Sequence, residues 1–131
     1  MTFQRINPAD VAEPMGGVYS HGIVVPPGAA LLFTAGQVGV KKDGSIPPDM
    51  ADQAKVVWDN LVAILRDAGM GVTDIVKMTA FVVGKDNFPK YAEVRKQYLA
   101  GHRAASTAYF VPALVRPEML IEVEIIAAKK P

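Results

Sequence analysis

The 131 residues suit one domain, and 50% hydrophobic with 21% charged residues is the balance of a globular rather than a disordered chain. The formal net charge of +1, with basic and acidic residues interspersed, argues against a nucleic-acid-binding surface. The chain has no cysteine, which excludes disulfides, a thiolate nucleophile and cysteine metal sites. We predict a single domain over residues 1–131 that uses no cofactor or metal.

The amino terminus reads "MTFQRINPADVAEP" and lacks the basic start and apolar run of a signal peptide. The fully apolar stretches of the chain also fall far short of the roughly 20 residues that cross a membrane as a helix. We therefore expect a cytoplasmic protein without membrane contact. Within this segment, "FQRI" at 3–6 is a candidate first short strand.

The following stretch predicts a β-hairpin. "VYSHGIVVPPGAALLFTAGQVGV" contains two β-rich runs, approximately 18–25 and 30–35, which are separated by Pro26-Pro27-Gly28. Because proline lacks the backbone N–H that a strand ladder needs, this tripeptide predicts a turn. "DGSIPPD" at 43–49 then marks a loop.

Two helices are predicted from apolar spacing. From Asp49 onward, apolar residues recur at steps of three and four, and Gly69 supplies a left-handed stop. Asn87 is a candidate cap for the second helix. The apolar stripe of that helix consists of Phe88, Tyr91, Val94, Tyr98 and Leu99, and helical aromatics at such spacing are usually core residues.

The strand between the helices, "DIVKMTAFVVG" at 74–84, is apolar on both faces. Alternation places Val76, Met78, Ala80 and Val82 on one face and Ile75, Phe81 and Val83 on the other. "STAYFVP" and "MLIEVEIIAA" complete the chain as strands joined through "ALVRPE", in the order β-β-β-α-β-α-β-β. Strand–helix–strand crossovers place both helices on one face of a mixed sheet and leave the other face uncovered. Because that face is apolar, we expect it to associate with other copies of the chain.

The last strand raises a question, because "LIEVEIIA" at 120–127 carries two carboxylates. Glu122 and Glu124 share one face with Leu120 and Ile126, whereas the opposite face is wholly apolar. One reading is an edge strand with a wet face, on which glutamates discourage aggregation. The other is a carboxylate that faces a pocket and serves in proton transfer or in holding water.

The ordered blocks "VYSHGIVV", "LLFTAGQVG", "AILRDAGM", "TDIVKMTAFV" and "RPEMLIEVEIIAA" together resemble the RidA/YjgF family, the reactive intermediate deaminases. The resemblance covers about residues 15–130. It implies a chorismate-mutase-like α+β domain that forms a homotrimer, with a central barrel of sheets and small-molecule clefts between subunits. These implications agree with the uncovered sheet face.

The resemblance also implies site residues. A family tyrosine that orients substrate and water falls on Tyr19, and a family glutamate falls on Glu122, so Glu122 is the expected catalytic carboxylate. The carboxylate-binding arginine of the family falls on Thr107, and a neighbouring cysteine on Tyr109. Threonine lacks the charged bidentate fork of guanidinium, so affinity for amino-acid-derived imines is expected to fall.

Further candidates flank these positions. The serine of the family's "T-S-G-Q" block falls on Ala35, beside Gly36, where glycine permits a turn or a close backbone approach. His21 follows Tyr19 by two residues and so lies on the same strand face. Arg103 and Arg116 are two candidate replacements for the missing arginine.

Two functions remain open at this stage. One is a hydrolase of an imine, enamine or related electrophile with altered substrate choice. The alternative is a non-catalytic small-molecule-binding or interaction protein on the same trimer. Nucleic acid is an improbable partner, because "GQVG" at 36–39 lacks the basic surroundings of an RNA-binding loop.

Overall fold

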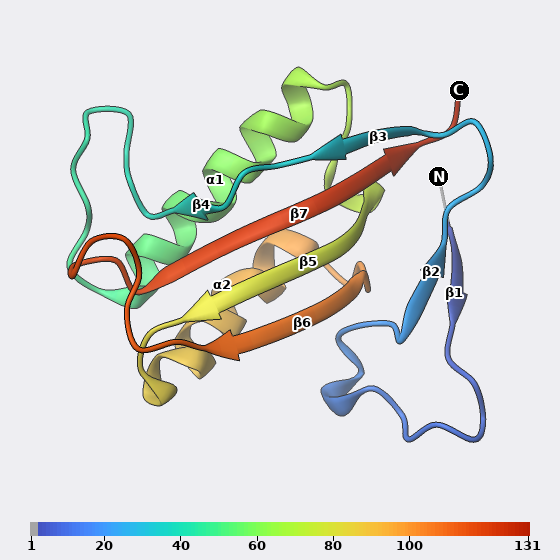
Figure 1. Cartoon of the computed structure of the whole chain (residues 1–131), viewed down its shortest axis with the longest axis horizontal. Coiled ribbons are helices and arrows are strands. Elements are labelled where there is room, and N and C mark those ends of the chain that lie inside the picture. Colours follow the sequence, from blue (N-terminus) through green and yellow to red (C-terminus); the bar gives the residue numbers. More distant parts are fainter. Residues whose placement is uncertain (1–2) are drawn as a thin grey trace.

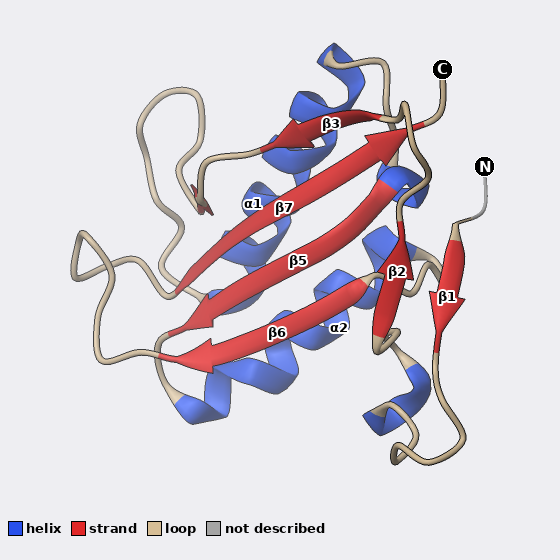
Figure 2. Cartoon of the chain, turned by 45° about the vertical axis from the view of Figure 1, so that its right-hand side comes forward, coloured by secondary structure: helices blue, strands red, loops and turns tan. Residues whose placement is uncertain are grey.

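The computed structural model describes residues 3–131 as an α+β domain in which two helices cover one face of a mixed sheet (Figures 1 and 2). The helices are α1, Met50–Asp67, and α2, Phe88–Leu99. The five-stranded sheet has the order β3-β7-β5-β6, with β4 also pairing β7. Its strands are β3 (Ala30–Phe33), β4 (Gln37–Val38), β5 (Ile75–Val82), β6 (Ala105–Phe110) and β7 (Ile121–Lys129). Only β5 and β6 run parallel.

Helix α1 forms as its sequence predicts. The Asp49 carboxylate accepts a hydrogen bond from the Asp52 backbone N–H at 2.8 Å and so caps the first turn. Gly69 has a φ of 72°, the left-handed conformation expected of the residue that ends a helix. The buried face of α1 includes Trp58 and Leu61, both wholly inaccessible to solvent, and packs on the sheet.

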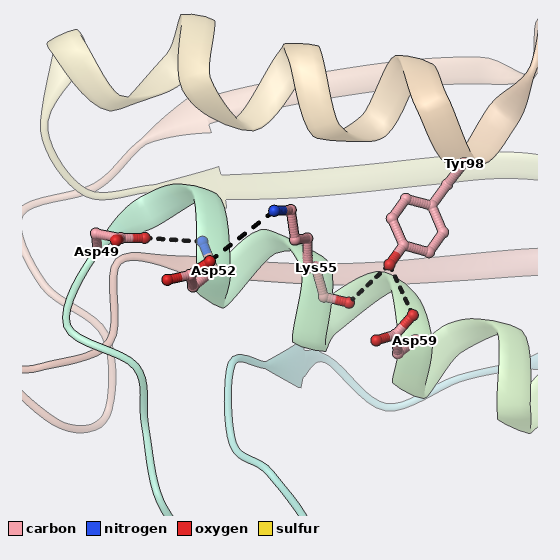
Figure 3. A network of polar contacts seen from close by, with 5 residues as sticks. All are labelled: Asp49, Asp52, Lys55, Asp59 and Tyr98. Carbon is pink, nitrogen blue, oxygen red and sulfur yellow. Dashed lines mark hydrogen bonds and ion pairs between the residues drawn. The ribbon is translucent and has the colours of Figure 1, made fainter.

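Helix α2 packs beside α1 through polar as well as apolar contacts. The Tyr98 hydroxyl lies 2.6 Å from a carboxylate oxygen of Asp59 and 3.3 Å from the Lys55 carbonyl (Figure 3). Asn87 is the N-cap residue of α2, as expected, but its side chain makes no capping hydrogen bond and instead donates to the Val83 carbonyl at 2.9 Å. The start of α2 is thus joined to the end of β5.

The expected hairpin over 18–25 and 30–35 is wrong in its pairing, although both runs contain strands. β2 (Gly22–Val24) pairs with β1 (Gln4–Ile6) in a separate two-stranded sheet, and β3 pairs with β7. The segment around the two prolines therefore connects two sheets. β7 offers β3 a long antiparallel partner, and such long-range pairing is not encoded in the turn.

The predicted assignment of β5 residues to the two faces of the sheet is also wrong at the start of the strand. A bulge between Ile75 and Lys77 breaks the alternation. Ile75 joins the main core under the helices, with Met78, Ala80 and Val82, whereas Val76 packs with Phe3 and Ala128 in a second cluster. Lys77, Thr79 and Phe81 are only half-buried.

The face of the sheet opposite the helices, called here the open face, carries these half-buried residues. β7 contributes Glu122, Glu124 and Ile126 to it, in register with Phe81, Thr79 and Lys77. Large apolar side chains on it remain accessible: Leu31 is 52% exposed, Phe33 67% and Tyr109 52%. The open face is thus largely uncovered, as predicted, except at the end where Ile126 packs in the second cluster with Phe3 and Ile23. It is also more polar than the alternation of β5 alone suggested.

Candidate functional site

Glu122 is held on the open face against a glycine. Its strand neighbours are Val38 on β4 and Phe81 on β5. A Cβ atom built on Gly36 would lie only 2.7 Å from the Glu122 carboxyl carbon and 2.9 Å from its Cγ. Since real side chains do not approach so closely, Gly36 is needed for this carboxylate to lie where it does.

The two glutamates of β7 differ despite sharing a face. Glu122 is half-buried against the Gly36 backbone, whereas Glu124 is exposed and lies opposite Thr79. Glu124 lines a separate cavity of about 240 Å³ together with Phe33 and Lys77. The alternation question therefore has a physical answer: the Gly36 backbone lies against the first carboxylate, whereas the second stays accessible.

β6 brings two predicted residues to the same face. Tyr109 stacks on Phe81, with ring centroids 5.6 Å apart and planes inclined by 15°. Because Phe81 lies opposite Glu122, the stacked rings form an aromatic wall beside the carboxylate. Thr107 accepts a hydrogen bond from the Lys77 ammonium at 2.8 Å.

Lys77 is a residue that the sequence reasoning missed. It supplies a cation beside Thr107, the position where the resemblance places an arginine. The sequence did contain evidence for this cation. Lys77 is the charged residue of a largely apolar strand, and it lies two residues from Thr79 and hence on the same face. Within residues 3–131, no carboxylate forms an ion pair with it.

Tyr19, His21 and Arg103 form a second group, remote from Glu122. The Tyr19 carbonyl accepts hydrogen bonds from Arg103 Nε at 3.1 Å and Nη2 at 2.8 Å. The Tyr19 ring meets the His21 ring edge to face, at 6.0 Å between centroids. His21 Nε2 donates to the Ala12 carbonyl at 2.6 Å, so this histidine holds the preceding loop.

The two groups do not meet within one chain. Ser20, next to Tyr19, pairs with Ala105 at the start of β6, whereas the Phe81–Tyr109 wall lies four residues further along that strand. Four residues of strand span roughly 13 Å. Tyr19 and Glu122 therefore lie in separate parts of the chain.

The remaining predicted positions are less involved. Ala35 is exposed, and its carbonyl accepts a hydrogen bond from the Gln37 side chain at 3.3 Å. Arg116 forms an ion pair with Glu118 in an exposed loop, at 2.5 Å. Among residues 3–131, no cluster of side chains could hold a metal ion, and no helix is long and apolar enough to cross a membrane.

The comparisons with known proteins agree with each other. A family model described as Endoribonuclease L-PSP matches residues 11–129. TdcF of Escherichia coli K12 is 34% identical over 116 residues, which span 86% of this chain and 88% of TdcF. The 2-iminobutanoate/2-iminopropanoate deaminase of the same organism is 34% identical over 117 residues, or 87% of this chain and 89% of that enzyme.

Solved structures give the same picture. The Rid-family protein YyfB from Yersinia pestis superposes with a TM-score of 0.86 at 30% identity, covering 98% of this chain and 100% of the other. A crystal structure of E. coli TdcF with bound serine superposes with a TM-score of 0.73 at 32% identity, covering 97% of this chain and 99% of that chain.

Proposed function

Because the chain belongs to the RidA/YjgF family, described also as the Endoribonuclease L-PSP family, we propose that it is an imine deaminase in which Glu122 activates water. The relative named 2-iminobutanoate/2-iminopropanoate deaminase supports this reaction class. The observation that carries the proposal is the Glu122 carboxylate, held against Gly36 beside an aromatic wall on an open surface.

The proposed reaction adds water to a carbon–nitrogen double bond. Glu122 takes a proton from water as the oxygen attacks the imine carbon, and the imine nitrogen gains a proton. The resulting carbinolamine then loses ammonia, so that an imine and water yield a carbonyl compound and ammonia. An imine carbon is already electrophilic, so placement of water and proton transfer are the main demands on the protein.

The substrate is proposed to be a small molecule and not RNA, despite the family description. The two histidines do not form a pair that could act as general acid and general base on RNA. His21 Nε2 donates to the Ala12 carbonyl, and His102 Nε2 donates to the Ile75 carbonyl at 2.7 Å, so the two rings hold separate segments of the chain. The bound serine in the TdcF structure supports a small ligand as well.

We further propose that the working form is a homotrimer with clefts between subunits. The exposed Leu31, Phe33 and Tyr109 support burial of the open face against other copies. The separation of Tyr19 from Glu122 also supports a cleft to which two subunits contribute.

The test compares two isosteric variants on one strand. Glu122→Gln keeps the shape of the side chain but removes the base, so ammonia release from imines generated in situ should be abolished. Glu124→Gln makes the same chemical change two residues away and should retain most of the rate. Circular dichroism and sedimentation equilibrium check that both variants keep the wild-type fold and mass.

Three outcomes count against the proposal. Wild-type turnover in the Glu122→Gln variant would remove the carboxylate from the reaction. A dissociated assembly in that variant alone would make Glu122 a structural residue. A wild-type protein that binds imine analogues without releasing ammonia would favour the non-catalytic alternative.

A further inference from the structure

A cavity of about 290 Å³ lies between strand β1 and the segment that follows helix α2. Arg5 on β1 and Arg103 bring two positive charges to its lining, and Thr73 and His102 bring polar groups. The cavity lies apart from Glu122, which does not line it. Its volume is just below the roughly 300–1,000 Å³ of sites for drug-sized ligands, so it suits a smaller molecule.

Arg5 is held at the edge of this cavity by its strand. It lies opposite Ile23 in the antiparallel pair of β1 and β2. Phe3, two residues earlier, is only 6% exposed and packs with Val76 and Ala128 in the second apolar cluster. Arg5 itself is exposed. Packing thus anchors the backbone, while the guanidinium group stays accessible to a ligand from solution.

Arg103 borders the cavity with one edge of its guanidinium group already bonded. Nε and Nη2 donate to the Tyr19 carbonyl at 3.1 and 2.8 Å. These bonds use the Nε–H and one Nη2–H, so the Nη1–H and the other Nη2–H remain as a parallel pair of donors. Such a pair matches two oxygens of an oxyanion in bidentate geometry. A carbonyl partner also leaves the positive charge of Arg103 unneutralised.

Both positive charges lack a protein counterion. Within residues 3–131, neither Arg5 nor Arg103 forms an ion pair with a carboxylate, and no acidic residue lines the cavity. Two like charges at one small cavity repel each other. An anion between them would replace this repulsion with two attractions, so the charge pattern favours an anionic ligand.

The donors around the cavity favour a dianion with more than two oxygens. A carboxylate offers a single charge and two oxygens, which one guanidinium fork already occupies. The second guanidinium and the Thr73 hydroxyl would then be left without a match. His102 Nε2 donates to the Ile75 carbonyl at 2.7 Å, which fixes the ring in the cavity wall. A phosphate group, with roughly two negative charges and three acceptor oxygens near neutral pH, matches this set of donors.

We propose that this cavity is a phosphate-binding site, in which Arg5 and Arg103 hold a small tetrahedral dianion between them. Arg103 binds two oxygens through the free edge of its guanidinium group, Arg5 binds from the solvent side, and the Thr73 hydroxyl donates to a further oxygen. Inorganic phosphate and the terminal group of a small phosphate monoester share this chemistry. The site goes beyond the proposed deaminase function, because it does not involve Glu122 and requires no turnover.

Isothermal titration calorimetry at constant ionic strength, at about pH 8 where phosphate is mainly a dianion, tests the binding with three probes. The probes are inorganic phosphate, glycerol 3-phosphate and acetate, and the last presents a singly charged carboxylate. We expect phosphate to bind at least tenfold more tightly than acetate, because hydrogen bonds to a charged group contribute roughly 10- to 100-fold in affinity. Glycerol 3-phosphate separates the two sources of the ligand. An affinity comparable to that of phosphate assigns the site to monoesters as well, and binding of phosphate alone assigns it to the free ion.

Two arginine variants and a matched control locate the site. Arg5→Gln removes an exposed cation that forms no ion pair within residues 3–131, so the fold should persist and affinity for phosphate should fall roughly 10- to 100-fold. Arg103→Gln should cause a loss of the same order. Arg66→Gln removes the same charge from the exposed last turn of α1, outside the cavity, and should leave affinity for phosphate unchanged.

Thermal unfolding gives a second readout. Phosphate should raise the melting temperature of the wild type, because a ligand that binds only the folded state stabilises it, and should raise that of Arg5→Gln much less. Unchanged phosphate affinity in the Arg5 variant would overturn the proposal, as would an equal loss in the Arg66 variant or a wild-type affinity for phosphate no greater than for acetate. None of these measurements depends on imine hydrolysis, so failure of the proposed reaction would leave their result unaffected.

Discussion

Replacing Gly36 with alanine tests the Glu122 carboxylate without touching it. The added Cβ would lie 2.7 Å from the Glu122 carboxyl carbon, whereas ordinary contacts begin near 3.4 Å. The carboxyl carbon must therefore retreat by about 0.7 Å, and the nearer oxygen by more. A displacement of about 1 Å costs on the order of 100-fold in rate, or about 2.7 kcal/mol of barrier.

The fold should tolerate this change, because the obstructing atoms belong to the end of a flexible side chain. A distorted rotamer costs about 0.5–1.5 kcal/mol, which lowers the melting temperature by only a few degrees. We expect kcat for imine hydrolysis to fall on the order of 100-fold while the circular dichroism spectrum stays that of the wild type.

Gly39→Ala is the matched control. Its Cβ would lie 2.9 Å from the Gln53 Cα, which belongs to the backbone of α1 and cannot retreat. That variant should lose about 1–3 kcal/mol of stability. Comparing kcat and melting temperature for the two variants separates placement of the carboxylate from packing. A Gly36 variant with wild-type kcat would refute the role given to Glu122.

Further predictions concern assembly, substrate choice and pH. Sedimentation equilibrium at micromolar concentration should give three times the 14.0 kDa chain mass, and a monomer mass would contradict the trimer. In a semicarbazide competition assay, 2-iminobutanoate should be hydrolysed poorly compared with a family member that has the arginine at the position of Thr107; equal activity would mean that another residue replaces it. Partial burial and the Asp59 carboxylate raise the pKa of Tyr98 from 10.0 to about 12. The associated stability is therefore present below pH 10 and lost as the pH rises to 12. Across that interval, the melting temperature of the wild type should fall more than that of Tyr98→Phe, and parallel curves would refute the coupling.

The sequence predicted the elements whose evidence is local. Apolar spacing with Asp49 and Gly69 defined α1, and the β-branched run defined β5, because caps and periodicity depend on neighbours in the chain. The ordered sequence blocks also predicted the family, which the family match and the relatives confirm. Strand partners were harder: β3 pairs with β7, across most of the chain, and no turn signal encodes that choice.

The residues of the candidate site show the same contrast between local and long-range evidence. A close backbone approach at Gly36 was predictable from glycine at a strand end, but its partner Glu122 was not, because 86 positions separate the two in the numbering. Alternation places Lys77 on the same face as Thr79 and Phe81, but it was overlooked because alternation does not show what that face meets. Its contact with Thr107 depends on parallel pairing of β5 and β6, a long-range feature.

The division of the polar groups into two sets has a consequence for catalysis. Arg103 and Tyr19 lie by the start of β6, whereas Glu122 lies at the end of β7 that is paired with β4. In the proposed trimer, a cleft between subunits would bring the Tyr19 group of one copy beside the Glu122 carboxylate of another. Dilution that dissociates the proposed trimer would then remove turnover, because the reaction would need both sets of residues together.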